Sequence, residues 1–204
     1  MVKAVAFDAD NTLYLTKPAA KPSDMAAMDV LSARAGKPAE GLYEEFINIV
    51  KGVKDSPDPA MRHRMYSYNK LSQKYGVDLA EAMYQSFAEK LLELIAPVPG
   101  IENILEKLKN DSIQMLVITE DNRLITEKKL STLGLAKYFD KIISSDDTGT
   151  MKPSEKYYEA LLEDTSPEEI MVVGDNFEKD LKIPKELGMK TLLVEQPRDL
   201  EKIL

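Results

Sequence analysis

The sequence contains no cysteine and only one histidine, His63. Without cysteine, the chain can form neither a disulfide nor a thiolate metal site, and this composition fits an intracellular protein. Long apolar runs are missing as well, so no segment approaches the length of a membrane-spanning helix. The first charged residues come too soon after the N-terminus for a signal peptide. We therefore expect a cytoplasmic protein with no membrane partner.

Acidic residues outnumber basic residues in this sequence. The chain has 27 lysine and arginine residues against 35 aspartate and glutamate residues, which gives a net charge of −8. This balance argues against nucleic acid as the main partner, and an anionic small molecule needs a locally positive pocket. With 204 residues, 44% hydrophobic and 30% charged, the chain suits one globular domain or a domain with an insertion. The high charge, the missing cysteine and several loop prolines also suit a thermophilic source.

The most informative stretch is residues 5–13, Val-Ala-Phe-Asp-Ala-Asp-Asn-Thr-Leu. It begins as a short apolar run, which is typical of a buried strand, and then reaches Asp8 and Asp10. Residues two apart in a strand point to the same face, so the two carboxylates are expected to lie together. Like charges in a half-buried place are costly unless a cation or a reaction uses them. The run also favours a turn, and these residues alone leave both interpretations open.

Residues 16–98 show a helical pattern only. Four helices are expected from caps and breakers: one capped by Ser23 and closed by Gly36, one from Pro38 to Gly52, one that ends before Gly76, and one that opens on a capping box of Asp78 and Glu81. Residues 55–59 are expected to form a loop, and His63 to lie on an exposed helix face. Prolines place the connections to the rest of the chain at residues 18–22 and 97–100.

Outside this block, short apolar strands alternate with helices. Beyond the opening run, strands are expected at residues 114–119, 141–145, 170–174 and 191–195, and helices at residues 101–110, 124–133, 154–164 and near 185–187. Such alternation predicts a parallel sheet with helices on both faces. We therefore expect an α/β fold with a Rossmann-like core of residues 1–15 and 99–204, into which an all-α four-helix cap of residues 16–98 is inserted.

Polar side chains follow several of the expected strands. In an open parallel sheet, ligands bind beyond the carboxyl ends of the strands. The residues delivered there share oxygen or ammonium groups: Asp8 and Asp10, then Thr119 with Glu120, Asp121 and Asn122, then Lys152, and finally Asp175 and Asp180. Each has a purely structural alternative, such as a strand-end cap, a solvated lysine or an acid at a helix N-terminus. Their convergence on one edge favours a functional site.

This set of residue types is suited to phosphoryl transfer. Hard oxygen ligands without histidine or cysteine suit Mg²⁺. Lys152 and Thr119 could hold phosphate oxygens, and one carboxylate could attack phosphorus to form an aspartyl-phosphate. The second carboxylate could protonate the leaving alkoxide and later activate water. Phosphate monoesters hydrolyse extremely slowly in water, and such a cluster of charges is what their hydrolysis needs.

The chain resembles the phosphatases of the haloacid dehalogenase superfamily that carry a helical cap in the first cap position, and within them the phosphoglycolate phosphatase and β-phosphoglucomutase group. The four motifs of that family occur here in order: residues 7–13, residues 117–119 (Val-Ile-Thr), Lys152-Pro153, and residues 174–176 (Gly-Asp-Asn) with Asp180. The resemblance covers nearly the whole core, and it extends to the cap by position and helicity only.

The resemblance implies a role for each matching residue. Asp8 corresponds to the nucleophile and a Mg²⁺ ligand, and Asp10 to the general acid and base. The backbone carbonyl of Asp10 and the carboxylate of Asp175 complete the ligands that the protein supplies.

The resemblance also implies roles for three residues that are neither the nucleophile, the acid and base, nor a metal ligand. Thr119 and Lys152 correspond to the residues that bind the transferring phosphoryl group, and Lys152 also offsets the charge on Asp8. Asp180 resembles an acid that orients Lys152 or a metal-bound water.

The chain departs from the family at Glu120, where many relatives carry asparagine. An acid there repels a phosphate dianion unless it points away or meets a positive group. Glu120 and Asn122 are candidate substrate contacts, and three arginines are further candidates for specificity: Arg62, Arg64 and Arg123. Asp10 favours a phosphatase over a dehalogenase, because an alkoxide leaving group needs a proton and a halide does not.

We therefore expect a phosphoric monoester hydrolase that acts with Mg²⁺ on a small phosphorylated metabolite, as a monomer or homodimer. A phosphosugar mutase of the same superfamily stays open as an alternative. A Mg²⁺- and phosphate-binding regulator without turnover is a second alternative from another class. A receiver-type phosphoacceptor shares the aspartate, threonine and lysine chemistry, but not the cap or the Gly174-Asp175 segment.

Overall fold

The computed structural model describes residues 1–54, 56, 58–162 and 165–204. The chain divides into two compact units. One, the core unit, comprises Met1–Thr16 and Ala96–Leu204, and the other, the helical unit, comprises Lys17–Ile95. The helical unit begins one residue later and ends three residues earlier than the insertion expected from the sequence.

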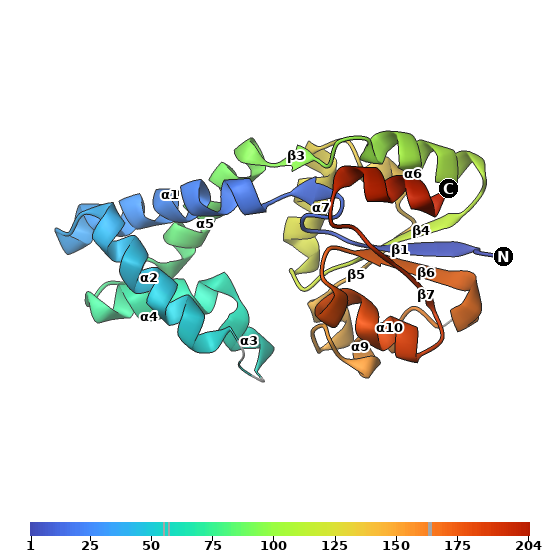
Figure 1. Ribbon diagram of the computed structural model, residues 1–204. Helices are drawn as coiled ribbons and strands as arrows, with labels where there is room; N and C mark the ends of the chain where they lie inside the picture. Colours follow the sequence, from blue (N-terminus) through green and yellow to red (C-terminus); the bar gives the residue numbers. More distant parts are fainter. Residues whose placement is uncertain (55, 57, 163–164) are drawn as a thin grey trace. The chain divides into compact units, whose positions relative to one another are not determined.

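A five-stranded parallel sheet lies at the centre of the core unit (Figure 1). Its strands are β1 (Ala4–Asp8), β4 (Gln114–Ile118), β5 (Lys141–Ile143), β6 (Ile170–Gly174) and β7 (Lys190–Leu193), in the order β5-β4-β1-β6-β7. β1 pairs with β4 on one side and with β6 on the other. All five residues of β1 are buried, because helices cover both faces of the sheet. The expected α/β fold is confirmed.

Alternate residues of β1 belong to two different apolar clusters. Val5 and Phe7 pack on the face covered by α6 (Ile101–Asn110), α7 (Arg123–Thr132) and the 3₁₀ segment η4 (Pro197–Ile203). Ala4 and Ala6 pack on the opposite face. That face is covered by three elements: α9 (Glu155–Glu159), the π-helical turn η3 (Phe177–Leu181) and α10 (Lys182–Glu186). Full burial of a side chain such as Phe7 contributes roughly 1.5–3 kcal/mol. This two-sided burial fixes where β1 ends, and with it the position of Asp8.

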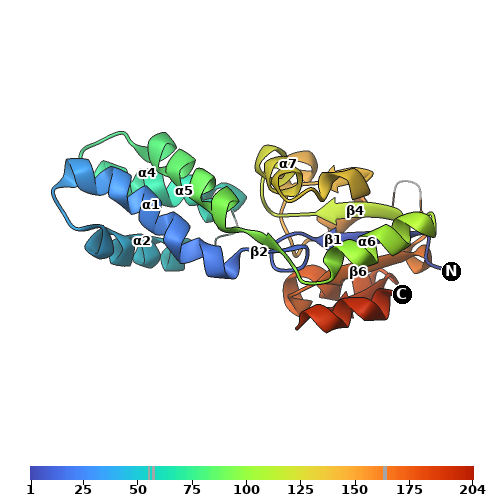
Figure 2. The same cartoon turned by 90° about the horizontal axis from the view of Figure 1, so that it is seen from above.

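Several short elements complete the core unit. They are β2 (Tyr14–Leu15), β3 (Ala96–Pro97), η1 (Ala136–Tyr138), α8 (Ser145–Thr148) and η2 (Pro167–Glu169). β2 and β3 pair antiparallel and mark where the chain leaves the core unit and returns to it (Figure 2). The start of α8 at Ser145 ends the strand that was expected to reach that residue.

The prediction of a proline-rich connection at residues 18–22 is wrong. Pro18 and Pro22 lie inside α1 (Lys17–Ala35). Pro18 is the second residue of the helix, where a backbone N–H has no intrahelical partner, so proline is tolerated. Ser23, expected to cap this helix, also lies inside it, and its hydroxyl donates to the carbonyl of Ala19 at 2.7 Å.

The helical unit contains five helices among the residues described, where four were expected. They are α1, α2 (Ala39–Val53), α3 (Pro59–Arg62), α4 (Arg64–Lys74) and α5 (Ala80–Leu94). The expected third helix divides at His63, whose extended ψ of 140° interrupts the helical path. Nδ1 of His63 accepts the N–H of Met65 at 3.2 Å and so caps α4. The prediction of an exposed histidine on a helix face is therefore wrong.

Two other boundary predictions differ from the structure. The expected capping box does not form, since the N-cap of α5 is Leu79 rather than Asp78 and no side chain caps this helix. α9 ends at Glu159, well before the expected residue 164. Residues 163–164 of that predicted helix, and residues 55 and 57 of the predicted loop, lie outside the described residues.

The core of the helical unit is aromatic and encloses one acid. The rings of Phe46 and Tyr68 stack at 4.9 Å, and α1 runs beside α5 (Figures 1 and 2). Asp24 of α1 is buried, where it accepts the hydroxyl of Tyr68 at 2.7 Å and pairs with Arg64. Among the helices that the structure describes, none has both the length and the apolar composition to cross a bilayer.

Candidate active site

Four segments of the core unit meet at the carboxyl edge of the sheet. Asp8 is the last residue of β1, and Thr119 follows β4 directly. Gly174 ends β6, so that Asp175 is the first residue beyond it. Lys152 comes from the loop that precedes α9. The sheet order places β4 and β6 on either side of β1, so the strand ends flank Asp8.

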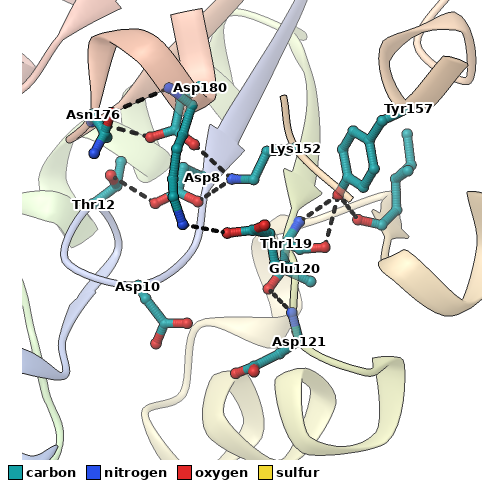
Figure 3. A network of polar contacts seen from close by, with 12 residues as sticks. Asp8, Asp10, Thr12, Thr119, Glu120, Asp121, Lys152, Tyr157, Asn176 and Asp180 are labelled. Atoms are coloured by element: carbon teal, nitrogen blue, oxygen red, sulfur yellow. Dashed lines mark hydrogen bonds and ion pairs between the residues drawn. The ribbon is translucent and has the colours of Figure 1, made fainter. Parts of the chain in front are cut away.

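The carboxylate of Asp8 is held at both oxygens (Figure 3). The ammonium of Lys152 contacts Oδ1, and the hydroxyl of Thr12 donates to Oδ2 at 3.2 Å. Asp8 is 8% exposed and Lys152 is 2% exposed. Burial raises the pKa of Asp8 to about 7, although Lys152 acts in the opposite direction. A bound cation at this edge would favour the ionised form of Asp8 further.

Lys152 forms a second ion pair with Asp180. Its Nζ lies 2.7 Å from Oδ1 of Asp180, whose Oδ2 accepts the N–H of Asn176 at 3.0 Å. Burial alone lowers the pKa of Lys152, but the carboxylates of Asp8 and Asp180 raise it well above its usual range. Lys152 is therefore protonated, and its charge lies between the carboxylates of Asp8 and Asp180.

Asp8, Asp175 and Asp180 each offer a carboxylate oxygen, and these oxygens all lie within 4.8 Å of one another. Carboxylate oxygens without histidine or cysteine form a donor set for a hard divalent cation. The residues at this edge therefore fit the kind of metal ion that the sequence suggested.

Asp10 lies beyond the strand rather than within it. The chain turns after Asp8: the N–H of Leu13 donates to the carbonyl of Ala9 at 2.9 Å, and Asn11 has a φ of 67°. Asp10 therefore does not share a strand face with Asp8, so the prediction that the two side chains lie together on one face of a strand is wrong. The turn that the same residues also favour is present. Its carboxylate lies apart from the Asp8 cluster in Figure 3 and pairs with Lys129 at 3.0 Å. Desolvation raises the pKa of Asp10, against the effect of Lys129.

Thr119 is fixed by a tyrosine from α9. The backbone N–H of Thr119 donates to the hydroxyl oxygen of Tyr157 at 2.8 Å. The same hydroxyl lies 2.8 Å from the carbonyl oxygen of Thr119 and 2.7 Å from that of Ile143. Tyr157 thereby joins the ends of β4 and β5 behind the site (Figure 3). Its neighbour Tyr158 contacts the carbonyls of Lys179 and Asp180 at 2.8 and 3.0 Å.

Glu120 meets a positive group of the protein. Its Oε2 pairs with Nζ of Lys179 at 3.0 Å, and Lys179 immediately precedes Asp180. Asn122 caps α7, since its Oδ1 accepts the N–H of Ile125 at 2.9 Å. Whether either side chain also contacts a substrate stays a prediction.

The three arginines suggested for specificity are divided between the two units. Arg123 donates to the carbonyl of Ile142 at 2.8 Å and pairs with Asp147 at 2.7 Å in the core unit. Arg62 and Arg64 belong to the helical unit.

Comparison with known proteins identifies the family. A profile of haloacid dehalogenase-like hydrolases matches residues 2–188. The chain belongs to the haloacid dehalogenase-like hydrolases. The resemblance seen in the four motifs is thereby confirmed, and the protein is an enzyme of the hydrolase class.

Curated relatives of this haloacid dehalogenase-like hydrolase include named phosphatases. It is 27% identical over 202 residues to a ribulose-1,5-bisphosphate 5-phosphatase of Halopiger xanaduensis, covering 95% of this chain and 84% of the relative. It is 29% identical over 199 residues to a glyceraldehyde 3-phosphate phosphatase of Methanothermobacter thermautotrophicus, covering 95% and 86%. The crystal structure of a haloacid dehalogenase-superfamily phosphatase from Thermococcus onnurineus shares the fold, with a TM-score of 0.77, 24% identity, and coverage of 99% and 97%.

Four residues of this hydrolase's site were not predicted from the sequence: Lys129, Tyr157, Tyr158 and Lys179. A signal existed for Lys129, which lies four residues after the buried Ile125 and so on the apolar stripe of α7. The two adjacent tyrosines have no comparable signal, because a helix cannot turn neighbouring residues to one face.

Proposed function

We propose that the protein is a Mg²⁺-dependent phosphatase that hydrolyses a small phosphorylated metabolite through an aspartyl-phosphate on Asp8. The observation that carries the proposal is the fixed carboxylate of Asp8, held by Lys152 at one oxygen and by Thr12 at the other. A buried carboxylate oriented next to a permanent cation is prepared for attack on an anionic phosphate ester.

In the first step, an oxygen of Asp8 forms a bond to phosphorus while the bond from phosphorus to the ester oxygen breaks. Asp10 donates a proton to the departing alkoxide. Lys152 and Thr119 bind the equatorial oxygens of the transferring group, where negative charge is spread. Tyr157 supports this step by fixing the backbone of Thr119.

In the second step, Asp10 removes a proton from a water molecule that attacks the aspartyl-phosphate. The bond from phosphorus to Asp8 breaks, inorganic phosphate leaves, and the carboxylate of Asp8 is regenerated. Asp10 thus ends the cycle in its starting protonation state.

Asp8 and Asp175 would hold the Mg²⁺ ion with the carbonyl of Asp10, and Asp180 lies close enough to orient the ion's surroundings. When bound, the ion supplies positive charge that offsets the repulsion between the Asp8 carboxylate and the phosphate.

The substrate is proposed to be a phosphorylated sugar or a related small phosphate ester. Support comes from two relatives of similar length, which are named for glyceraldehyde 3-phosphate and ribulose-1,5-bisphosphate. The helical unit is proposed to act as the cap that selects the substrate, as the resemblance implies.

The proposal is tested by phosphate release from a panel of phosphorylated metabolites, with and without Mg²⁺. We expect release that depends on Mg²⁺ in the wild type, and none from Asp8→Asn, which keeps the shape of the side chain but not its charge. Release without Mg²⁺, or by Asp8→Asn, contradicts the proposal. Analysis of the products with a sugar phosphate separates hydrolysis from transfer back to the sugar, which a mutase would perform.

A further inference from the structure

Lys129 is a buried cation that bridges two acids at the edge of the site. It is 2% exposed, and its Nζ donates to Oδ1 of Asp10 at 3.0 Å and to Oδ2 of Asp121 at 2.6 Å. The ring of Tyr14 lies beneath the ammonium, with its centroid 5.4 Å from Nζ. The charge is thus enclosed by two carboxylates and one aromatic face.

Such a burial is costly and calls for an explanation. Removing an ammonium from water carries a large desolvation penalty, which only well-placed partners offset. Burial acts to lower the pKa of Lys129, but Asp121 and Asp10 outweigh it, so the pKa lies above its usual range and the side chain stays charged. An apolar residue would fill the same stripe of α7 without this cost. The position of the charge therefore matters more than the packing.

Asp121, the second acid bound by Lys129, also contacts Thr119, which is proposed to bind the transferring phosphoryl group. The backbone N–H of Asp121 donates to the hydroxyl oxygen of Thr119 at 3.1 Å. A chain of polar contacts therefore runs from Thr119 through Asp121 and Lys129 to Asp10. Lys129 donates to one oxygen of Asp10, so the carboxyl group is oriented while its other oxygen lies outside this hydrogen bond.

We propose that Lys129 is a positioning residue for proton transfer: it sets the orientation of the Asp10 carboxyl group relative to the ester oxygen. The inference rests on the proposed function, in which Asp10 protonates the leaving group. Asp121 serves as the fixed anchor that keeps the lysine extended toward Asp10.

The leaving group separates this role from a merely structural one. An alkyl phosphate needs its departing oxygen protonated, whereas 4-nitrophenyl phosphate releases a stable phenolate that needs little help. If Lys129 acts through Asp10, its loss slows kcat/KM for the alkyl ester selectively. If it only stabilises the fold, both substrates lose activity together.

The experiment compares Lys129→Met with Lys128→Met, an exposed neighbour on the same helix. With Mg²⁺ present, we expect Lys129→Met to reduce kcat/KM for glycerol phosphate by about 10–100-fold and that for 4-nitrophenyl phosphate by less than about threefold, since general acid catalysis contributes about 10²–10⁴-fold. Lys128→Met should match the wild type on both. Mg²⁺ affinity, measured by calorimetry, should change little in either variant, because Asp10 is expected to meet the ion through its carbonyl.

A second variant covers the case in which Lys129→Met does not fold. Lys129→Met combined with Asp121→Asn removes one charge of each sign and leaves Asp10 with its own charge, and we expect the same selective loss. An equal loss on both esters in a folded variant, or no loss on either, overturns the role of Lys129. A wild-type protein that hydrolyses neither ester nor any member of the metabolite panel contradicts instead the proposed function, and with it this role.

Discussion

Gly174 and Asp180 approach so closely that a β-carbon on Gly174 would lie 2.6 Å from the β-carbon of Asp180 and 2.8 Å from its Oδ2. The absence of a side chain at the end of β6 is therefore what allows Asp180 to reach Lys152. The glycine of the fourth motif is required here for space, since its φ lies outside the left-handed region.

Gly174→Ala should displace Asp180 and disturb the ion pair with Lys152. We expect a destabilisation of about 1–3 kcal/mol, as for other overpacked sites. A misplacement of about 1 Å at a catalytic site can cost about 100-fold, so turnover should fall by at least about tenfold. Thermal unfolding and kcat measured on the same preparation check both effects.

Gly52→Ala is the matched control. Gly52 is exposed in α2, and nothing lies within 4 Å of an added β-carbon. Because alanine favours a helix more than glycine, this change should stabilise the protein by roughly 0.5–1 kcal/mol and leave turnover unchanged. Wild-type turnover in Gly174→Ala would show that the close approach has no functional role.

The pair of Glu120 and Lys179 predicts a charge effect on substrate affinity. Lys179→Met leaves the carboxylate of Glu120 without this partner, next to Thr119, which is proposed to bind the phosphoryl group. Since partly exposed ion pairs are worth up to about 1 kcal/mol, we expect KM to rise by about twofold to fivefold with little change in kcat. Adding Glu120→Gln to the variant should restore KM, because the repelling charge is then gone. A KM that stays raised in the double variant contradicts this explanation.

Glu45 of the helical unit predicts a dependence of stability on pH. Hydrogen bonds from Lys37, Lys74 and Tyr75 lower the pKa of Glu45 from 4.5 to about 2. Because the folded value lies below the unfolded one, the unfolded chain takes up the proton first as the pH falls. The stabilisation is therefore present above about pH 4.5 and is lost as the pH falls toward 2.

Glu45→Gln tests this dependence by urea unfolding at several pH values. We expect the variant to be less stable than the wild type by about 0.5–1 kcal/mol at pH 7, and the difference to shrink below pH 4.5. The neighbouring Glu44 is exposed, and Glu44→Gln serves as the control at each pH. A difference that stays constant down to the lowest pH at which both proteins are folded would mean that Glu45 stabilises the unit without its charge.

The sheet was predictable because its strands are short apolar runs followed by polar residues. β6 matches its expected bounds, and α6 begins and ends at the expected residues. Those runs also placed Asp8, Thr119 and Asp175 at one edge, since parallel strands deliver their carboxyl ends together. Burial on both faces and a fixed strand direction are enough to bring such residues near one another.

The residues that support the site were harder to predict. Tyr157 and Tyr158 act through their hydroxyl groups on backbone carbonyls that are distant in sequence, and no local pattern encodes such partners. Two adjacent lysines, Lys128 and Lys129, are typical of a solvent-exposed helix face. The four-residue spacing from Ile125 nevertheless places Lys129 on the buried side of α7. Long-range partners decide these roles, and a single sequence does not reveal them.

The predicted helix boundaries were wrong where one side chain can form either of two local hydrogen bonds. Ser23 was interpreted as a cap, but serine also bonds back to a carbonyl four residues earlier inside a helix, as it does to Ala19. His63 was interpreted as a surface residue, but its ring nitrogen accepts a backbone N–H and starts a new helix. At His63 the local hydrogen bond interrupts the helical pattern, whereas at Ser23 it lies inside a helix that begins at Lys17.

The central claim, that Asp8 carries the phosphoryl group and Asp10 the protons, is tested most directly in Asp10→Asn with 4-nitrophenyl phosphate. The first step needs little acid with this substrate, whereas the second step lacks its base. We predict a burst of about one nitrophenolate per active site, and mass spectrometry after acid quenching should find the phosphoryl group on Asp8. A burst-free reaction at the wild-type rate, or a phosphoryl group on any other residue, would contradict the account.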